Sequence, residues 1–179
     1  MRATLLIFIC ILCLTSAAMG QVEQGDTEIQ FMGYIAVTSG MTMGTIQTLI
    51  GYYVSPNLQV GAGPAITITS YSFPEFNEYT YEMEDNTETN IDLSLSLFGT
   101  YNFSTNEQMI PYVTATIYQY SFDIPEGMDF TDFSYLTFGG GIKYFLNAYV
   151  AVNSSATYGI PLGGGSGMLL LFGGLSVFL

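Results

Sequence analysis

The stretch LQVGAGPAITITSY, residues 58–71, alternates almost throughout between two kinds of side chain. One set is apolar and comprises Leu58, Val60, Ala62, Ile66 and Ile68. The other is small or polar and comprises Gln59, Gly61, Gly63, Thr67 and Thr69. Successive side chains of a β-strand point to opposite faces of a sheet, so this period of two predicts a strand with one apolar and one polar face.

The same alternation recurs along the chain between turn signals. It predicts eight strands, at about residues 28–39, 42–53, 58–71, 90–103, 109–122, 133–145, 148–158 and 168–179. A membrane-spanning helix needs about 20 apolar residues, and no such run occurs in this sequence. Within a membrane, strands must close on themselves to satisfy their backbone groups. We therefore expect an all-β fold, an eight-stranded antiparallel up-and-down transmembrane β-barrel with both chain ends on the periplasmic side.

The N-terminus has the pattern of a cleaved signal peptide. Arg2 precedes an apolar run over residues 5–14, and Ala18 and Gly20 occupy the small positions of a cleavage site. We expect residues 1–20 to be removed and residues 21–179 to form the barrel domain.

Removal of the signal peptide leaves a chain with almost no positive charge. Cys10 and Cys13 leave with it, and Lys143 remains as the basic residue against 15 acidic ones. Nucleic-acid binding is excluded, because it requires several Lys or Arg to neutralise phosphates. Charged residues make up only 9% of the chain, against about 25% in soluble domains. Much of the surface therefore faces something other than water.

A soluble β-sandwich also alternates, but two patterns favour the barrel. The connections after the third, fifth and seventh strands (residues 72–89, 123–132 and 160–167) are longer than those after the second, fourth and sixth, as in outer-membrane barrels. Aromatic residues gather at strand ends, which predicts a girdle at each membrane interface. One girdle comprises Tyr52, Tyr53, Tyr101, Phe103, Tyr112, Tyr144, Phe145, Tyr149 and Phe178. The other comprises Tyr71, Phe73, Tyr118, Tyr120, Phe122, Phe133, Tyr135 and Tyr158.

Three sequence segments are expected to lie at strand–turn–strand junctions: GYYVSPNLQVG at residues 51–61, IPYV at residues 110–113 and GGGIKYFL at residues 139–146. They resemble the junctions of the OmpA-like, opacity-type outer-membrane β-barrel family, and the resemblance covers the whole mature chain. The C-terminus is similar to that family's insertion signal at Gly174, Val177 and Leu179, and departs from it at Phe172 and in ending with Leu179 after Phe178. The resemblance implies the barrel fold and the cell outer membrane, and specifies no activity. A secreted or surface-anchored β-sandwich, with residues 168–179 as an anchor signal, remains the alternative.

The mature sequence has no histidine and no cysteine. The most common general base, the thiolate nucleophile and the usual zinc ligands are therefore missing. We expect no enzymatic activity, no metal and no cofactor.

The connection predicted over residues 72–89 mixes acidic and aromatic side chains. The candidate external contacts are Phe73, Phe76, Tyr79, Tyr81, Glu82, Glu84 and Asp85. Such a segment is typical of a solvated, self-repelling surface. It is also compatible with a divalent-cation site that bridges to lipopolysaccharide phosphates, or with an adhesive tip for a surface or host ligand. Outer-membrane lipid is the expected surrounding, and we expect a monomer.

The polar strand faces predict the contents of the lumen. They carry Gln59, Thr67, Ser94, Ser96, Thr114, Thr116, Asn153 and Thr157, together with the bulky Phe98 and Tyr135. Eight strands enclose room only for side chains or one small ligand. We therefore expect a mostly filled lumen and a structural or surface-adhesion role. A narrow porin-like channel for small solutes is the alternative, because inward glycines leave some space.

Lys143 shares a strand face with Gly139 and Gly141, so it is expected to point into the lumen. An ammonium group in a narrow lumen requires a counter-charge or water. Glu28 is the predicted partner in a structural ion pair, and Glu107 is the alternative. A lysine that reaches periplasmic water without a partner is an equal possibility at this point.

Overall fold

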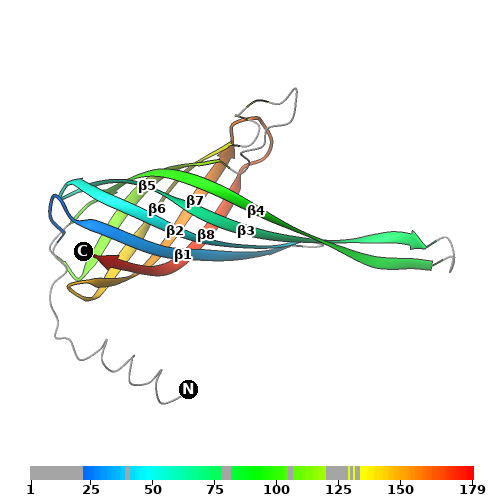
Figure 1. The fold of residues 1–179 in the computed structure, drawn as a ribbon, viewed down its shortest axis with the longest axis horizontal. Coiled ribbons are helices and arrows are strands. Elements are labelled where there is room, and N and C mark those ends of the chain that lie inside the picture. The colour runs from blue at the N-terminus through cyan, green and yellow to red at the C-terminus, as the bar shows by residue number, and fades with distance from the viewer. Residues whose placement is uncertain are drawn as a thin grey trace, which may run out of the picture.

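The computed structural model describes residues 22–38, 41–77, 82–104, 107–119, 129, 131 and 134–179, without the side chains of residues 36–38, 41, 73–77 and 82–85. The strands are β1 (Thr27–Thr38), β2 (Met41–Ser55), β3 (Leu58–Asn77), β4 (Glu82–Asn102), β5 (Met109–Gln119), β6 (Ser134–Asn147), β7 (Val150–Pro161) and β8 (Met168–Phe178). Each pairs antiparallel with the next, and β8 pairs with β1 (Figure 1). The predicted closed barrel of eight antiparallel strands is confirmed.

No helix in the described part of the chain is both long and apolar enough to cross a membrane.

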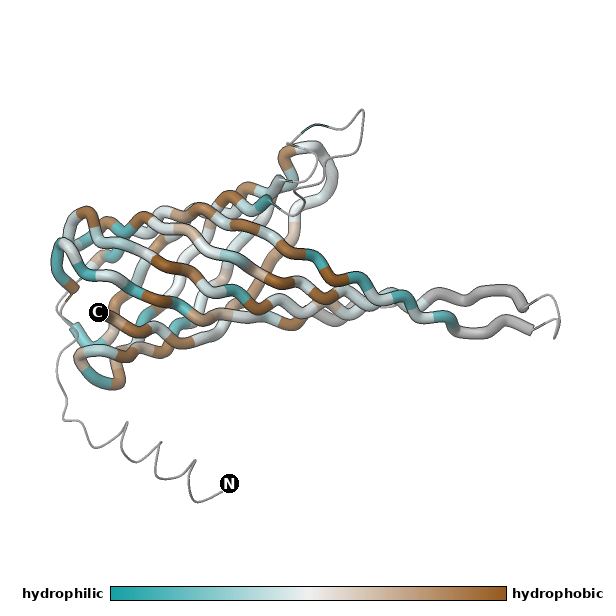
Figure 2. Tube along the Cα trace, viewed as in Figure 1, coloured by the Kyte–Doolittle hydropathy of each residue, from teal (hydrophilic) through white to brown (hydrophobic). Residues whose placement is uncertain are grey.

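The two faces of each strand differ in burial, as the alternation predicts. On β7, Asn153 and Thr157 are buried, whereas Val152 and Tyr158 are exposed. Of the predicted inward residues, Gln59, Thr67, Ser94, Ser96, Phe98, Thr116, Asn153 and Thr157 are buried, and Thr114 and Tyr135 are half-buried. The opposite faces leave large apolar side chains exposed around the wall, and Figure 2 shows hydrophobic residues along the barrel strands. Such an outward apolar surface is what a transmembrane barrel presents to lipid.

The two predicted aromatic girdles are only partly correct. Five of their members are buried inside the barrel instead, namely Tyr53, Tyr112, Tyr118, Phe145 and Phe178. The reason is the pleat, because successive residues of a strand point to opposite faces and these five occupy positions that face inward. The outward members are Tyr52, Tyr71, Tyr101, Phe103, Tyr144, Tyr149 and Tyr158. Tyr120, Phe122 and Phe133, and the side chain of Phe73, lie outside the described residues.

One end of the barrel, here called the turn end, holds the short connections β2–β3, β4–β5 and β6–β7. The Asn147 side chain accepts the amides of Tyr149 at 2.8 Å and Val150 at 2.9 Å, which stabilises the β6–β7 turn. Thr27 and Leu179 exchange two backbone hydrogen bonds at this end, of 3.2 and 2.9 Å. The beginning of β1 and the end of β8 therefore lie side by side there.

At the other end, β3 and β4 continue past the rest of the wall as a two-stranded ribbon (Figure 1). Pairing of β2 with β3 ends at Met41 and Tyr71, and pairing of β4 with β5 ends at Leu95 and Gln119. The β3–β4 pairing continues without a register shift to residues 77 and 82. We call residues 72–77 and 82–94 the ribbon.

The prediction that residues 72–89 form an irregular connection is wrong for the described part of this segment. Residues 72–77 and 82–89 are strand. Residues 86–90 are polar and exposed on both faces of β4, so the alternation that reveals a half-buried strand is absent there. Cross-strand pairs of hydroxyl groups support it instead: Ser70 and Thr89 lie 2.8 Å apart, and Ser72 and Thr87 lie 3.5 Å apart.

Candidate functional site

Lys143 of β6 and Glu28 of β1 are in contact inside the barrel, close to the turn end. The ammonium Nζ lies 2.5 Å from Glu28 Oε2, and the two side chains are 1% and 0% exposed. Lys143 also donates to the Tyr53 hydroxyl at 2.8 Å and to Gln59 Oε1 at 3.5 Å. The structure therefore brings together the two residues that the sequence placed opposite each other, whereas the alternative partner, Glu107, is exposed.

The Glu28 carboxylate receives further hydrogen bonds from three other strands. The Tyr53 hydroxyl and the Gln59 amide donate to Oε2 at 2.7 and 2.9 Å. Ser176 of β8 donates to Oε1, and Asn153 of β7 donates to Ser176. A buried charge is tolerated where a counter-charge and hydrogen bonds replace its hydration. The sequence predicted the pair, but not the residues that surround it.

A glycine makes room for this network. A Cβ at Gly51 would lie 2.1 Å from Gln59 Nε2 and 2.6 Å from Gln59 Cδ. Alanine at position 51 would therefore displace the side chain that donates to Glu28.

An apolar cluster closes the barrel between this network and the turn end. It comprises Val22, Tyr53, Ile110, Phe145, Ala151 and Phe178, all buried. The segment that carries Val22 is held by two 2.9 Å bonds, from the Gly25 amide to the Tyr53 carbonyl and from the Tyr53 amide to the Asp26 carbonyl. Gly25 has a φ of 102°, which an L side chain rarely adopts and which turns the segment toward the lumen. We call this cluster the apolar seal; Val22 was not among the predicted inward residues.

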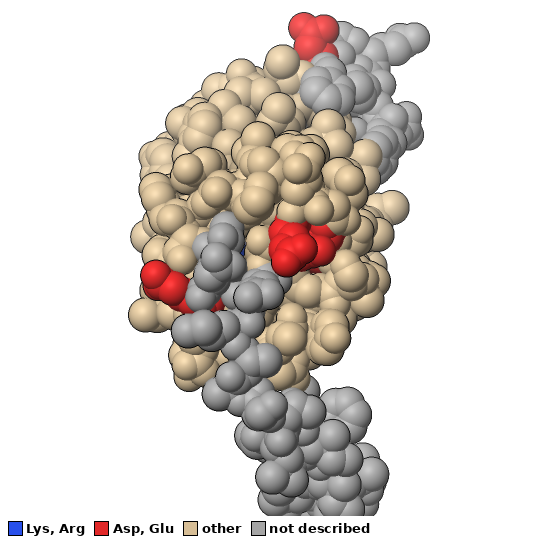
Figure 3. Space-filling view, turned by 90° about the vertical axis from the view of Figure 1, so that its left-hand side faces the viewer, with Lys and Arg blue, Asp and Glu red and all other residues tan. Residues whose placement is uncertain are grey.

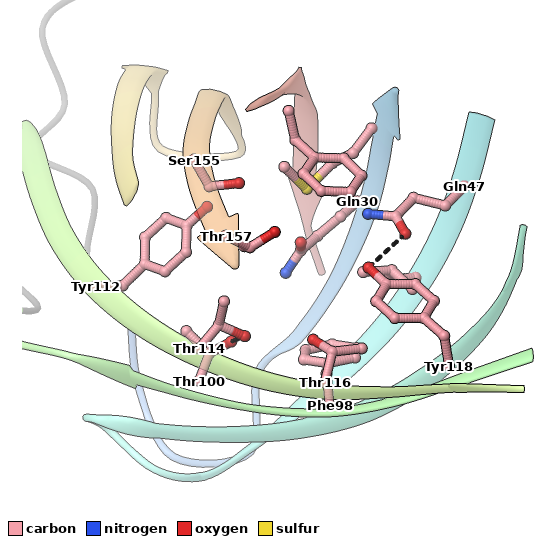
Figure 4. A pocket seen from close by; sticks show the side chains of 13 residues that line it. Gln30, Gln47, Phe98, Thr100, Tyr112, Thr114, Thr116, Tyr118, Ser155 and Thr157 are labelled. Carbon is pink, nitrogen blue, oxygen red and sulfur yellow. Dashed lines mark hydrogen bonds between the residues drawn. The ribbon is translucent and has the colours of Figure 1, made fainter. Parts of the chain in front are cut away.

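The middle of the lumen holds a small cavity (Figure 4). Its volume is about 30 Å³, which is room for about two water molecules. Polar side chains from Gln30, Thr100, Thr114 and Ser155 line it together with the rings of Phe98 and Tyr112. The Tyr118 hydroxyl crosses the lumen to donate to Gln47 at 3.1 Å. Among the described residues, side chains from different strands thus meet across the lumen beside this cavity.

Three buried oxygen atoms, Asn102 Oδ1, Asn153 Oδ1 and Thr157 Oγ1, have no hydrogen-bond partner among the described residues. Thr157 lines the central cavity. Buried polar atoms of this kind mark the lumen as a polar core and not an apolar one. Within the described chain, no group of three or more His, Cys, Asp or Glu residues is placed to hold a metal ion.

No family model matches the chain, and no curated protein matches it in sequence. Two solved structures resemble it in fold. The N-terminal β-barrel domain of Pseudomonas aeruginosa OprF has a TM-score of 0.53 and 16% identity, over 87% of this chain and 98% of that one. A structure described as de novo design of transmembrane β-barrels has a TM-score of 0.51 and 16% identity, over 90% of this chain and 100% of the other. The chain has the fold of a transmembrane β-barrel.

In this fold, the candidate external contacts fall at the ribbon. The backbone of residues 73 and 76 belongs to β3, and that of residues 82, 84 and 85 belongs to β4. Tyr79 and Tyr81, and the side chains of Phe73, Phe76, Glu82, Glu84 and Asp85, lie outside the described residues. The described side chains of the ribbon on β4 include the exposed Glu88, Asn90 and Asp92. Figure 2 shows hydrophilic residues where the ribbon leaves the barrel.

The opposite end of the molecule is also acidic. Figure 3 faces the turn end and shows patches of Asp and Glu with almost no basic surface. This agrees with the burial of Lys143, the basic side chain of the described residues.

Proposed function

We propose that the chain is a small outer-membrane barrel with a structural or surface-adhesion role, which presents the ribbon to the surroundings of the cell. The observation that carries this proposal is that β3 and β4 remain paired well beyond the end of the barrel wall. A barrel that served only to fill the membrane would not need such an extension.

The outward surface and the expected signal peptide support an outer-membrane location. On β3, the outward apolar residues run from Leu58 to Ile68. About ten residue steps of about 3.3 Å, tilted by about 40°, span about 25 Å, which matches the apolar band of outer-membrane barrels. Short turns of such barrels face the periplasm, so the ribbon would point outward and outer-membrane lipid would surround the wall.

A narrow porin-like channel is the less favoured function. The apolar seal, the hydrogen-bonded Lys143–Glu28 network and the roughly water-sized cavity of about 30 Å³ occupy successive levels of the lumen. We also propose no enzymatic role and no cofactor, because the sequence has no histidine and its cysteines are in the expected signal peptide.

The acidic and aromatic residues around the ribbon tip are the proposed contacts, as Phe73, Phe76, Tyr79, Tyr81, Glu82, Glu84 and Asp85. Tyr and Phe supply contact area to a surface or host ligand. Carboxylates can in addition bind divalent cations shared with lipopolysaccharide phosphates.

Shortening the ribbon tests the adhesive role. Residues 73–86 are replaced by an Asn-Gly turn, because Ser72 is paired with Thr87 and Asn-Gly favours a two-residue hairpin. Cells that carry the intact protein should bind to a panel of host-cell and abiotic surfaces more strongly than cells with the shortened ribbon. A matched control shortens the β7–β8 connection, residues 162–167, by two residues. Equal binding by all three strains, at equal amounts of folded protein, would leave only the structural role.

A further inference from the structure

Three methionine side chains gather inside the barrel, toward the end opposite the turn end. They come from three neighbouring strands, β1, β2 and β8. The group, here called the methionine cluster, comprises the buried Met32, Tyr34, Leu170 and Phe172 and the half-buried Met43 and Met168. Met109, the other methionine with a described side chain, is exposed at the turn end. The described thioethers are therefore concentrated at one place in the lumen.

The alternation of the strands directs all three methionines inward. Each lies two residues from a buried residue of its own strand, Met32 from Gln30, Met43 from Thr45 and Met168 from Leu170. Met32 and Phe172 also line the central cavity. The cluster is thus part of the lumen and not of the lipid-facing wall.

The sulfur of Met43 already takes part in a polar contact. The Tyr34 hydroxyl donates to Met43 Sδ at 3.6 Å, so a lone pair of this thioether is directed into the cluster. The rings of Tyr34 and Phe172 meet edge to face, with centroids 4.9 Å apart. Because methionine is unbranched and has several rotatable bonds, the thioethers of Met32 and Met168 can turn toward the same point without movement of the strands.

The donors of the cluster suit a soft cation with a single positive charge. Thioether sulfur selects soft metal ions such as Cu(I), and aromatic rings attract cations. A divalent ion held only by such neutral groups would keep its whole charge in a buried site, which is costly. Histidine and cysteine, whose absence led us to expect no metal, are the usual ligands of zinc. Their absence does not affect a thioether site.

The charge of the protein also favours a cation. The sequence holds 15 acidic residues against two basic ones, and such a field raises the local concentration of cations. Lys143, the basic side chain of the described residues, is paired with Glu28 near the turn end. No described ammonium group therefore lies in the cluster to repel a bound cation.

We propose that the methionine cluster binds one soft monovalent metal ion of the Cu(I) class. The thioethers of Met32, Met43 and Met168 are the ligands, and the rings of Tyr34 and Phe172 lie beside the ion. A cluster that only fills the lumen would pack similarly with leucine, which offers no donor atom to a metal. This inference goes beyond the proposed function and does not depend on an adhesive role of the ribbon.

The test uses Ag(I) as its first probe, because Ag(I) is a soft monovalent ion that needs no reductant. The mature chain, with isotope-labelled methionine methyl groups, is placed in lipid nanodiscs and titrated with silver nitrate in a chloride-free buffer with excess Mg²⁺. Mg²⁺ occupies the carboxylates, which prefer hard cations. Calorimetry measures the affinity and the stoichiometry, and NMR shows which methionines bind. A second titration, without oxygen, uses Cu(I) kept reduced by ascorbate.

Both ions should bind at one ion per chain and shift the methyl signals of Met32, Met43 and Met168. The double variant Met43→Leu/Met168→Leu nearly conserves side-chain volume. It should bind at least about tenfold more weakly, because even the loss of a group that only supports a metal ligand costs about 10–100-fold. Ag(I) should also raise the Tm of the unchanged protein more than that of the double variant, since a ligand of the native state stabilises it.

Met109→Leu is the matched control, because it removes an exposed thioether at the turn end. It should bind both ions as the unchanged protein does.

Three results would overturn the proposal: no saturable binding in excess Mg²⁺, equal affinity of the folded double variant, or methyl shifts confined to methionines outside the cluster. The methyl shifts are read from the unchanged protein, so they decide the question even if the double variant does not fold. Because adhesion is tested through the ribbon, a failure of metal binding would leave the proposed function standing.

Discussion

Glu28 and Lys143 form a buried ion pair of 2.5 Å across the lumen, although the strands that carry them, β1 and β6, are separated in the wall by β7 and β8. The pair is thus a contact between opposite parts of the closed barrel and not between neighbouring strands. Hydrogen bonds from β2, β3 and β8 meet at the same carboxylate.

Lys143→Met removes one charge of this pair and leaves the other buried. We expect the free energy of unfolding in detergent to fall by about 3–5 kcal/mol, because an uncompensated carboxylate would remain in the lumen. Thermal and urea unfolding, followed by circular dichroism, measure the change. Binding of cells to surfaces should remain intact at equal amounts of folded protein.

Combining this change with Glu28→Gln tests the coupling. The double variant should be more stable than the sum of the two single effects implies, because it buries no unpaired charge. Strictly additive effects would mean that the two residues do not stabilise the barrel as a pair.

Gly174→Ala should destabilise the seam between β8 and β1. A Cβ at Gly174 would lie 2.0 Å from the Phe31 carbonyl oxygen and 2.8 Å from Met32 Cα, which are backbone atoms that move little. We expect a loss of about 1–3 kcal/mol in the same unfolding experiments. Gly173→Ala is the matched control, because nothing lies within 4 Å of a Cβ built there. Equal stability of the two variants would contradict the packing described for this seam.

Val22→Asp should open the apolar seal. Burial of a valine side chain contributes about 1.5–3 kcal/mol, and a carboxylate placed there would be unpaired. The segment should therefore leave the mouth of the barrel, and the Gly25 amide, which bonds to Tyr53, should exchange faster with deuterium. Glu23→Gln changes an exposed neighbour and should have no effect. Unchanged exchange at Gly25 in Val22→Asp would argue that the seal does not hold the segment.

Purified protein in planar lipid bilayers should show no steady conductance of porin size. The seal and the ion-pair network fill the lumen near the turn end, and the cavity above them is about 30 Å³. A wide porin reconstituted in the same way serves as the positive control. Sustained large conductance from the folded protein would favour the channel function over the structural and adhesive one.

The sequence determined the number of strands and, for most positions, which side chain faces inward. The physical reason is that the side-chain period of a strand is two, so one apolar face identifies the orientation of every residue in the same strand. This reasoning also pointed Lys143 inward and suggested Glu28 as its partner.

Tertiary structure decided what the alternation does not encode. Closure of the barrel set Glu28 rather than Glu107 opposite Lys143, because the contact depends on the register of all the intervening strand pairs. Closure also directed Tyr53, Phe145 and Phe178 into the seal, where Val22 joins them from outside the strands. The part of the ribbon before residue 90 escaped prediction because residues 86–89 are polar and exposed on both faces, so pairing with β3 and not burial makes them a strand.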